Sequence, residues 1–416
     1  MHIPLEICDQ IAYYVWLDDG RALYLWDAAK HYSVPYWRSR KDLGNLRLVN
    51  KAFCHSAASW LFRHIDARYS ACRGPPHLER LMKLSKSPYA VYVRQIDFGF
   101  QETGSESTAY TAALYIEDLF GCLSSCLIKF FNLAALEFHE PPLGLSQEQR
   151  RAYMDAVSST LRYVPLSNLR ELELKFPLTY DFGRFFPTQT SSVQIPIEDV
   201  TQSLRHLGLY SCEYTNTRDQ RYWLKPVSPE NAALPNNVYA TRMLRMIEIA
   251  PNLQSLAIHS LDVLDIDFLA FPSSLCLRCL DLGGVSISCN NLLSLINQSI
   301  HSIRYINFSL VKLNSGTWRQ VLVRMCQLPY LLDIIIDASG YSLTGTSSDL
   351  ALGLLPERDC PQDIETIDSF DVPALGNLQR HVNSNRIAFG LQPFPETDYR
   401  HINGASLEYM LDLYHV

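Results

Sequence analysis

A short apolar pattern recurs through the middle of this 416-residue chain and constrains its fold more than any other feature. One apolar residue is followed by a second three positions later and by a third two positions after that. Eight such triples begin at Val93, Leu133, Leu169, Leu204, Leu253, Leu277, Ile303 and Leu331. A small or polar residue precedes most of the triples. Arginine follows the first apolar residue at Arg94, Arg170, Arg205, Arg278 and Arg304.

The spacing of the triples predicts a repeat. Successive triples start from 24 residues apart, between Leu253 and Leu277, to 49 apart, between Leu204 and Leu253. Helix-like segments such as 239–249 and 292–300 lie between them. A short parallel strand, a loop and a return helix would give an irregular leucine-rich-repeat solenoid, in which the apolar triples stack into a ladder. Each buried leucine would contribute roughly 1.5–3 kcal/mol. An α/β domain of another topology is the alternative.

Two stretches interrupt the period, and a tail follows it. Residues 177–200 and 212–238 are short of apolar pattern and predict inserted loops, either on a binding face or as variable surface. After Ile336 the pattern stops. We expect a helix over 372–388, with Leu375, Leu378 and Val382 on one face, and a short helix over 406–414. This tail is expected to cap the last repeat.

The N-terminal region has a different, helical pattern. Residues 3–11, IPLEICDQI, and 43–65, LGNLRLVNKAFCHSAASWLFRHI, carry apolar residues at helical spacing. Pro4 suits a first helical position. The predicted faces of the second stretch consist of Leu46, Val49 and Phe53, then Ala58, Leu61, Phe62 and Ile65. Ordinary core helices of an all-α cap would show the same pattern.

Taken in order, these N-terminal residues resemble the F-box, in the form common in fungal F-box proteins. The matching runs are Ile-Pro-Leu-Glu-Ile-x-x-x-Ile, Leu-Arg-Leu-Val-Asn-Lys-x-Phe and Ala-x-x-x-Leu-Phe-Arg-x-Ile, within residues 1 to about 66. Degenerate leucine-rich repeats commonly follow the F-box in that family. The resemblance implies a surface that docks the Skp adaptor of a cullin-based ubiquitin ligase. Its adaptor-binding residues would be Ile3, Pro4, Ile7, Ile11, Leu46, Val49 and Phe53.

Two departures from the family pattern stand out. Phe53 occupies a position where many F-boxes carry Trp, and residues 16–42 insert a long segment between the first and second helices. The predicted fold class is therefore α/β, with a three-helix F-box followed by an irregular repeat solenoid that has a parallel sheet and outer helices. The predicted domains are the F-box at 1–66, a linker with one helix at 67–90, the repeat domain at 91–338 and the cap at 339–416.

Composition bounds the partners and the compartment. The net charge of −7 and the lack of a dense Lys/Arg cluster argue against a nucleic-acid partner. No run of 18 apolar residues occurs, and Glu6 and Asp9 interrupt the first apolar stretch. We therefore expect no membrane partner and no signal peptide, in a soluble cytoplasmic or nuclear protein. The eleven cysteines are then expected to be reduced thiols. Cys276 and Cys279 lack the further ligands of a zinc site, so we expect no metal and no cofactor.

No nucleotide-binding, hydrolase, zinc-protease or kinase signature occurs in the sequence, so no enzymatic activity is expected. In a repeat solenoid the function would lie on the concave strand face, where side chains alternate with the apolar ladder. That face would be acidic, with Tyr and His interleaved, and would suit a protein segment of basic or mixed charge. The predicted target-binding residues are Glu137, Glu171, Glu173, His206, Tyr210, His259, Asp281 and Tyr305.

Together these features predict the substrate-recognition subunit of a Skp–cullin–F-box ubiquitin ligase. It would hold a target protein through the repeats and contribute to catalysis by proximity alone. Three other functions stay open. The chain could be an F-box scaffold outside a ligase, a plain repeat-type interaction module with N-terminal cap helices, or a hydrolase whose site forms only in three dimensions.

Overall fold

The computed structural model of the chain describes residues 3–17, 37–69, 77–100, 108–142, 145–186, 195–216, 227–269, 271–337, 339–342, 368 and 370–393. The chain is divided into two compact units, and the main division falls between Leu172 and Glu173. The predicted domain limits at 66, 90 and 338 follow changes in sequence character instead, and they stay a prediction.

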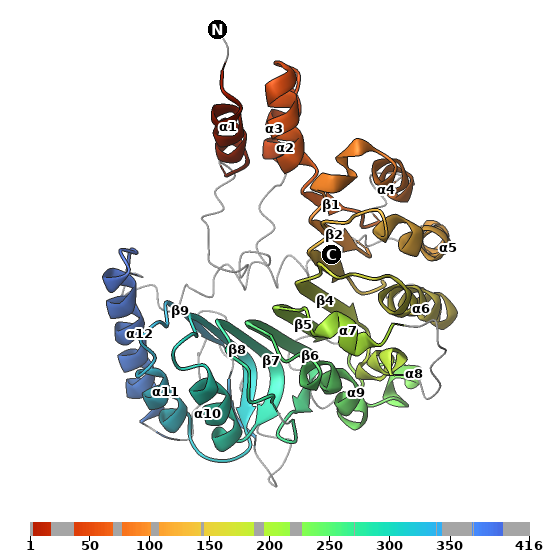
Figure 1. Cartoon of the computed structure of the whole chain (residues 1–416). Coiled ribbons are helices and arrows are strands. Elements are labelled where there is room, and N and C mark those ends of the chain that lie inside the picture. The colour runs from red at the N-terminus through yellow and green to blue at the C-terminus, as the bar shows by residue number, and fades with distance from the viewer. Residues whose placement is uncertain are drawn as a thin grey trace. The chain divides into compact units, whose positions relative to one another are not determined.

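The first unit begins with helices and continues as alternating strands and helices (Figure 1). Its elements are α1 Leu5–Leu17, α2 Trp37–Leu46, α3 Lys51–Leu61, β1 His64–Asp66, α4 His77–Ser85, η3 Pro88–Tyr92, β2 Gln95–Phe98, α5 Thr108–Leu127, β3 Ala135–Phe138 and α6 Gln147–Tyr163. β1 pairs with β2 and β2 with β3, both in parallel.

The second unit repeats this alternation. Its elements are β4 Glu171–Phe176, which spans the division, η4 Thr179–Phe185, α7 Ile197–Thr201, β5 His206–Ser211, α8 Pro229–Ala232, α9 Asn236–Glu248, β6 Ser255–Asp265, β7 Cys279–Ile287, α10 Cys289–Gln298, β8 Tyr305–Leu313, α11 Trp318–Met325, β9 Asp333–Asp337, β10 Gly340–Tyr341 and α12 Asp371–Ala388. β5 to β9 pair in sequence order, and all of these pairs are parallel. The predicted α/β class with a parallel sheet is confirmed.

The apolar triples form the core of both units. Each of the eight leads into one of the strands β2 to β9, and every side chain of the triples is buried. The pairing register places equivalent members side by side. In the second unit one row consists of Leu207, Leu256, Leu280, Ile306 and Ile334. The ladder predicted from the sequence is thus present along these strands.

Two kinds of hydrogen bond recur at equivalent positions of the triples. The carbonyl of the residue after the first apolar residue accepts two backbone N–H groups from the next strand, as Arg205 does from Gln254 and Ser255 at 2.7 and 2.9 Å. In addition, the side-chain amide of an asparagine immediately before a triple donates a hydrogen bond. The acceptor is the backbone carbonyl of the residue two positions before the preceding triple. These bonds join Asn132 to Val91, Asn168 to Phe131 and Asn252 to Gln202, at 2.8, 2.7 and 2.8 Å.

The two predicted loop insertions contain more order than expected. They include η4, α7 and α8, and a buried hydrogen-bond network joins them to β6. The Asp262 carboxylate accepts from the Thr215 backbone N–H and hydroxyl at 3.0 and 2.5 Å and from the Asn236 amide at 2.8 Å. Asn236 in turn accepts the Thr179 backbone N–H at 2.9 Å through its Oδ1. Four polar residues therefore satisfy one another inside the second unit.

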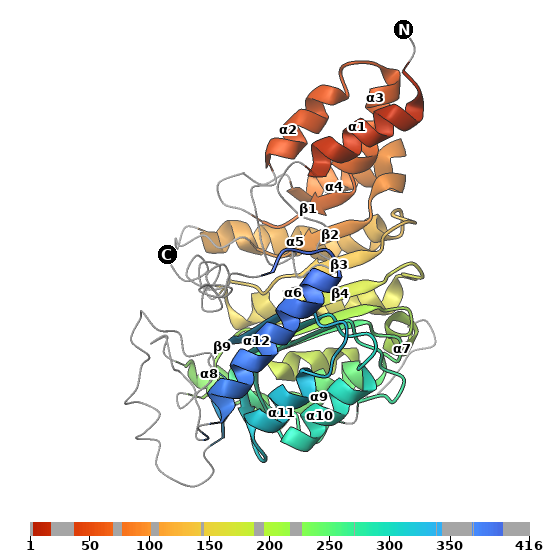
Figure 2. The same ribbon diagram turned by 90° about the vertical axis from the view of Figure 1, so that its left-hand side faces the viewer.

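Helix α12 covers the last part of this unit, where the cap was predicted. It packs against α11 and β9 (Figure 2), and Leu378 and Val382 are buried while Leu375 is half-buried. Asn385 donates to the Leu328 and Leu331 carbonyls at 3.1 and 3.0 Å, and Arg386 donates to the Leu332 carbonyl at 3.1 Å. These bonds satisfy backbone groups next to β9. The short helix predicted at 406–414 lies outside the described residues.

The N-terminal helices differ from the prediction in two places. Leu46, Val49 and Phe53 do not share one helix, because α2 ends at Leu46 and Asn50 caps a new helix by accepting the Phe53 N–H at 2.9 Å. The expected helix through Ile65 ends at Leu61, and Ile65 lies on β1 beside Ile96. The predicted insertion at 16–42 is also shorter at both ends, since α1 reaches Leu17 and α2 begins at Trp37.

Candidate functional site

The first candidate surface is formed by α1 and the turn between α2 and α3. These three helices share a small core of Ala12, Leu43 and Ala57, against which Leu46 and Trp60 pack. Tyr13 on α1 also lies against the Trp60 ring of α3, with centroids 5.2 Å apart. Small residues at the centre of this core bring the helices close together, and the larger apolar side chains are left at its margin.

Most of the predicted adaptor-binding residues lie at that margin. Ile3, Pro4, Ile7, Ile11 and Val49 are exposed; Ile7 is 43% exposed and Val49 62%. Leu46 is half-buried, and Phe53 is buried beneath the surface. Exposed isoleucines and valines at this density on a short three-helix unit are typical of a surface that another protein covers.

Three further apolar side chains belong to this surface but were not among the predicted residues. Leu5, Tyr14 and Leu48 are exposed, and Leu48 is 85% exposed. Leu48 was missed because a continuous helix over 46–53 was assumed. The signal that would have corrected this is Asn50, since Asn is a preferred N-cap residue and marks a new helix start. The turn before Asn50 turns Leu48 and Val49 outward.

An aromatic contact fixes these helices to the strands that follow. The Arg47 guanidinium lies 5.1 Å from the ring centroids of both Phe62 and Tyr89, and it donates to the Tyr89 hydroxyl at 3.2 Å. Phe62 and Tyr89 stack at 4.8 Å. Arg47 follows α2, and Tyr89 lies in η3, which leads into β2. The N-terminal surface therefore has a defined orientation within the first unit.

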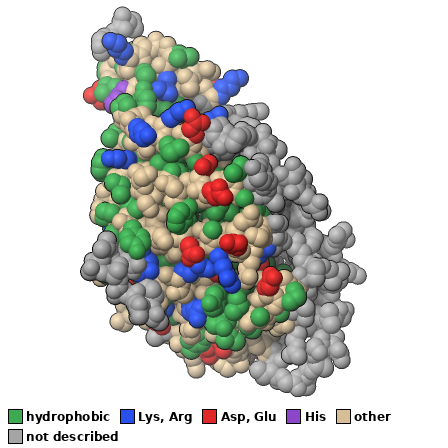
Figure 3. Space-filling model, turned by 90° about the vertical axis from the view of Figure 1, so that its right-hand side faces the viewer, with side chains coloured by type: hydrophobic (Ala, Val, Ile, Leu, Met, Phe, Trp, Pro, Cys, Tyr) green, Lys and Arg blue, Asp and Glu red, His purple; other side chains and the backbone are tan. Residues whose placement is uncertain are grey.

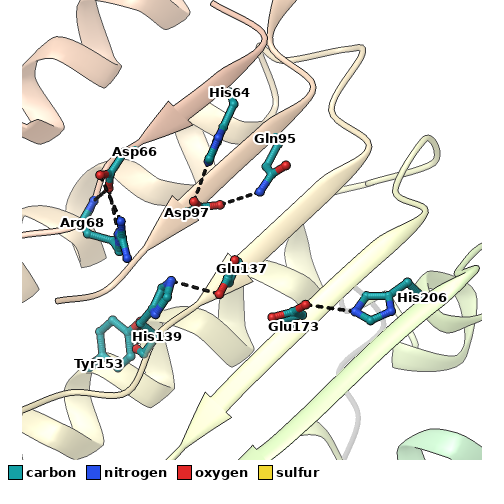
Figure 4. Close-up of polar contacts among 10 residues, drawn as sticks. All are labelled: His64, Asp66, Arg68, Gln95, Asp97, Glu137, His139, Tyr153, Glu173 and His206. Atoms are coloured by element: carbon teal, nitrogen blue, oxygen red, sulfur yellow. Dashed lines mark hydrogen bonds and ion pairs between the residues drawn. The ribbon is translucent and has the colours of Figure 1, made fainter. Parts of the chain in front are cut away.

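The second candidate surface is the polar face of the strands, opposite the apolar ladder. In the first unit, His64 on β1 bonds Asp97 on β2 at 2.5 Å, and His139 lies 3.1 Å from Glu137 in an ion pair (Figure 4). Arg68 pairs with Asp66 at 3.0 Å. Burial opposes ionisation of Asp66, but the Arg68 guanidinium outweighs burial and lowers the pKa of this carboxyl.

The same pairing occurs separately in the second unit. His206 on β5 lies 3.1 Å from Glu173 on β4 (Figure 4). On its other side, it lies 2.8 Å from the Ser255 hydroxyl on β6. On the next pair of strands, His259 forms an ion pair with Asp281 at 2.8 Å. Imidazole–carboxylate pairs thus connect neighbouring strands on this face.

One side chain from each of β4 to β7 forms a continuous row. The Lys175 ammonium lies 5.3 Å from the centroid of the Tyr210 ring, Tyr210 stacks on His259, and His259 pairs with Asp281. Lys175 was not among the predicted target-binding residues. The third apolar residue of the triple on β4 is Leu174, so strand alternation assigns the side chain of Lys175 to the opposite face. A buried lysine next to a tyrosine contributes a cation–π contact.

The predicted target-binding residues are buried or half-buried. Glu173, Tyr210 and Asp281 are buried, while Glu137, Glu171, His206, His259 and Tyr305 are half-buried. The side chains of neighbouring strands lie against one another on this face: His206 bonds Glu173, His259 pairs with Asp281, and Tyr210, in register with His259, stacks on it. Only the half-buried five present atoms that a partner can reach.

The described residues contain few other features of a chemical site. Among them no group of three or more His, Cys, Asp or Glu side chains is arranged to hold a metal ion. The described cysteines are free thiols, with Cys276 exposed and Cys279 buried. In the part of the chain that the structure describes, no helix has the length and apolar content to cross a membrane.

No family model matches the chain, and a search of curated proteins finds no match. Any assignment of function to this chain therefore rests on its residues and their geometry.

Proposed function

We propose that the chain is a substrate receptor of a Skp–cullin–F-box ubiquitin ligase. The observation that carries the proposal is the exposed apolar margin of α1 and the α2–α3 turn, where Ile3, Ile7, Ile11 and Val49 are exposed over a buried Phe53. Burying such side chains is worth roughly 25 cal/mol per Å² of apolar surface, so a matching partner surface would gain affinity by covering them. The F-box resemblance names the Skp adaptor as that partner.

The second part of the proposal assigns target binding to the polar strand face. In the second unit the half-buried His206, His259 and Tyr305 would contact the target, with Glu173 holding His206, and Tyr210 and Asp281 holding His259. In the first unit Glu137 and Glu171 are half-buried and would make target contacts of their own. With more carboxylates than cations, this set favours a segment of basic or mixed charge. The ligase function would then be to hold the target near the ubiquitin-carrying enzyme, and catalysis by the chain itself is not invoked.

A pull-down with purified Skp adaptor tests the first part. Wild-type chain should retain the adaptor, and a Pro4→Ala, Ile7→Asp double variant should lose it. Val323→Asp on α11 is the matched control, because Val323 is an exposed apolar side chain far along the sequence. If the wild-type chain fails to bind, or if the control and the double variant lose the adaptor equally, the proposal is wrong. If the wild-type chain does bind the adaptor, co-purification of a cullin would distinguish a receptor from a scaffold.

The target-binding surface is best tested with Glu171→Lys and not with a change at Glu173, because the two glutamates differ in burial. Glu171 is half-buried, whereas Glu173 is buried and bonded to His206, so its reversal would damage the fold itself. Targets identified by proximity labelling with the wild-type chain should be depleted with Glu171→Lys while adaptor binding is unchanged. Equal labelling by both would count against the polar face as the target surface.

A specific contact favours one rival function. The Arg47–Phe62–Tyr89 cluster packs the N-terminal helices onto η3, as cap helices of a plain repeat module would pack. In that case α1 to α3 would protect the first strands and bind no adaptor. The adaptor pull-down separates the two functions, since only the receptor and scaffold proposals require binding.

A further inference from the structure

Helix α5 displays an apolar outer face within the first unit. Leu114 is 43% exposed, Phe120 65% and Ile128 47%. The helical bonding continues one residue past Leu127, because the Ile128 N–H donates to the Ser124 carbonyl at 3.3 Å. Figure 3 views the side of the molecule on which the α5 and α6 labels lie in Figure 1, and hydrophobic side chains gather in several places on it.

Gly121 lies in the middle of this face. A Cβ added at Gly121 would meet nothing within 4 Å, so the described neighbours do not require a glycine there. Glycine inside a helix reduces its stability relative to alanine. The residue is explained if a second helix approaches this point closely, since the missing side chain lets two backbones come together.

The face is symmetric about Gly121. Leu114 lies seven residues before it and Ile128 seven residues after it, which places each about 10 Å from Gly121 along the helix axis. In an antiparallel pair of identical helices crossing at Gly121, Leu114 of one copy therefore lies opposite Ile128 of the other. Each Phe120 would enter the space beside the other copy's Gly121.

One acid and one base on α5 fit the same arrangement. Glu117 lies four residues before Gly121, and Lys129 lies eight residues after it, and both are exposed. In the antiparallel pair these two residues of different copies would be separated by about 6 Å along the axis, one helical turn, within reach of a lysine side chain. The pair forms twice, as an interface with a twofold axis requires.

We propose that the chain forms a homodimer through antiparallel packing of α5 against α5 of a second copy, with Gly121 at the twofold axis. A second copy of the chain is the partner that fits this face. The face itself supplies Leu114 and the Ile128 that would lie opposite it, and Glu117 and the Lys129 that would pair with it. The dimer does not depend on the ligase function, and its test uses a different part of the chain.

Sedimentation of the full chain between about 1 and 100 µM tests the proposal. Wild type should show a concentration-dependent monomer–dimer equilibrium. Gly121→Arg should raise the dimer dissociation constant at least about tenfold, because a charged side chain would be trapped between the helices. Gly376→Arg on α12 is the matched control, since a Cβ at this helical glycine also meets nothing within 4 Å. The control should leave the dimer intact.

Charge reversal makes the arrangement specific. Glu117→Lys and Lys129→Glu should each weaken the dimer, and the double variant should restore it, because every copy then carries the exchanged pair. A wild-type chain that stays monomeric throughout the range overturns the proposal. So does a dimer that Gly121→Arg leaves unchanged, or a double variant weaker than both single variants. Circular dichroism of each variant would show that the fold is retained.

Discussion

Tyr210 and His259 stack with their ring centroids 5.1 Å apart and their planes 15° apart. The stack depends on a glycine on the next strand. His259 pairs in register with Gly283, and a Cβ at Gly283 would lie 2.2 Å from the His259 Nδ1. The imidazole therefore occupies the space where a side chain of β7 would be.

Gly283→Ala should destabilise the second unit for this reason. The added methyl group would displace the His259 ring and weaken both its stack with Tyr210 and its ion pair with Asp281. Overpacking of this kind costs about 1–3 kcal/mol of unfolding free energy, measurable by urea denaturation. Gly376→Ala in α12 should instead stabilise the chain by about 0.5–1 kcal/mol, because its Cβ enters open space and alanine favours the helix. Equal effects would show that the His259 contact does not constrain position 283.

Asn236→Ala should cost far more than the loss of an exposed asparagine. Asn236 is fully buried and bonds Thr179, Thr215, Glu213 and Asp262. Truncation would leave the Asp262 carboxylate short of a donor in the interior, at a cost of about 2–4 kcal/mol. Asn252→Ala, which removes one exposed bond to the Gln202 carbonyl, should cost about 1 kcal/mol. Thermal unfolding of the two variants would compare them directly.

Asp333 should make stability depend on pH. Its Oδ1 is buried, and burial raises the pKa to about 6 although Arg386 opposes the shift. Because the folded-state pKa lies above the unfolded value, folding favours the protonated acid. That contribution is fully present below about pH 4 and is lost as pH rises through about 6.

Asp333→Asn keeps the shape and removes the titration. The variant should therefore gain stability over wild type as pH rises from about 4 to 7, by about 3 kcal/mol, and the gain should level off above about pH 7. Denaturant unfolding at several pH values would measure it. Glu248→Gln, an exposed change on α9, is the control and should show no such trend. A constant difference across the range would contradict the assignment.

Ile7→Asp should leave the fold intact, whereas Ala12→Asp should disrupt it. Both residues lie on α1, but Ile7 is exposed and Ala12 is fully buried between the three helices. A buried unpaired carboxylate costs several kcal/mol, while an exposed one costs a few tenths. Helix content and thermal unfolding would separate the variants. If Ile7→Asp unfolded the N-terminal helices, its loss of adaptor binding would be uninformative.

The strands were predictable because their signal is local. Each triple places apolar residues on one face within six positions, and burial of that face is the main energetic requirement of a strand next to helices. Leu207, Leu209 and their equivalents therefore appear where the sequence indicates. The helices over 236–248, 289–298 and 371–388 follow in the same way from apolar residues at helical spacing.

The remaining structure depends on partners distant in sequence. Thr179 and Asn236 are 57 residues apart, and nothing near either residue indicates that they meet. Glu173 likewise bonds His206, which follows it 33 residues later in the sequence. The break at Asn50 was within reach of the sequence, since an N-cap residue stands there, but the apolar spacing of Leu46, Val49 and Phe53 concealed it.

The asparagine bonds have a consequence for how such a chain can grow. Asn132, Asn168 and Asn252 each reach back only to the strand-and-helix unit immediately before their own. A tandem duplication of one whole unit would therefore carry its own asparagine. It would also offer the same backbone carbonyl acceptor to the asparagine of the unit after it. The three units joined in this way differ in length, from 36 to 49 residues between triple starts, because the bond joins fixed positions beside the triples whatever the length of the chain between them. Genes with this layout can change length by whole units while the spacing of the strands is kept.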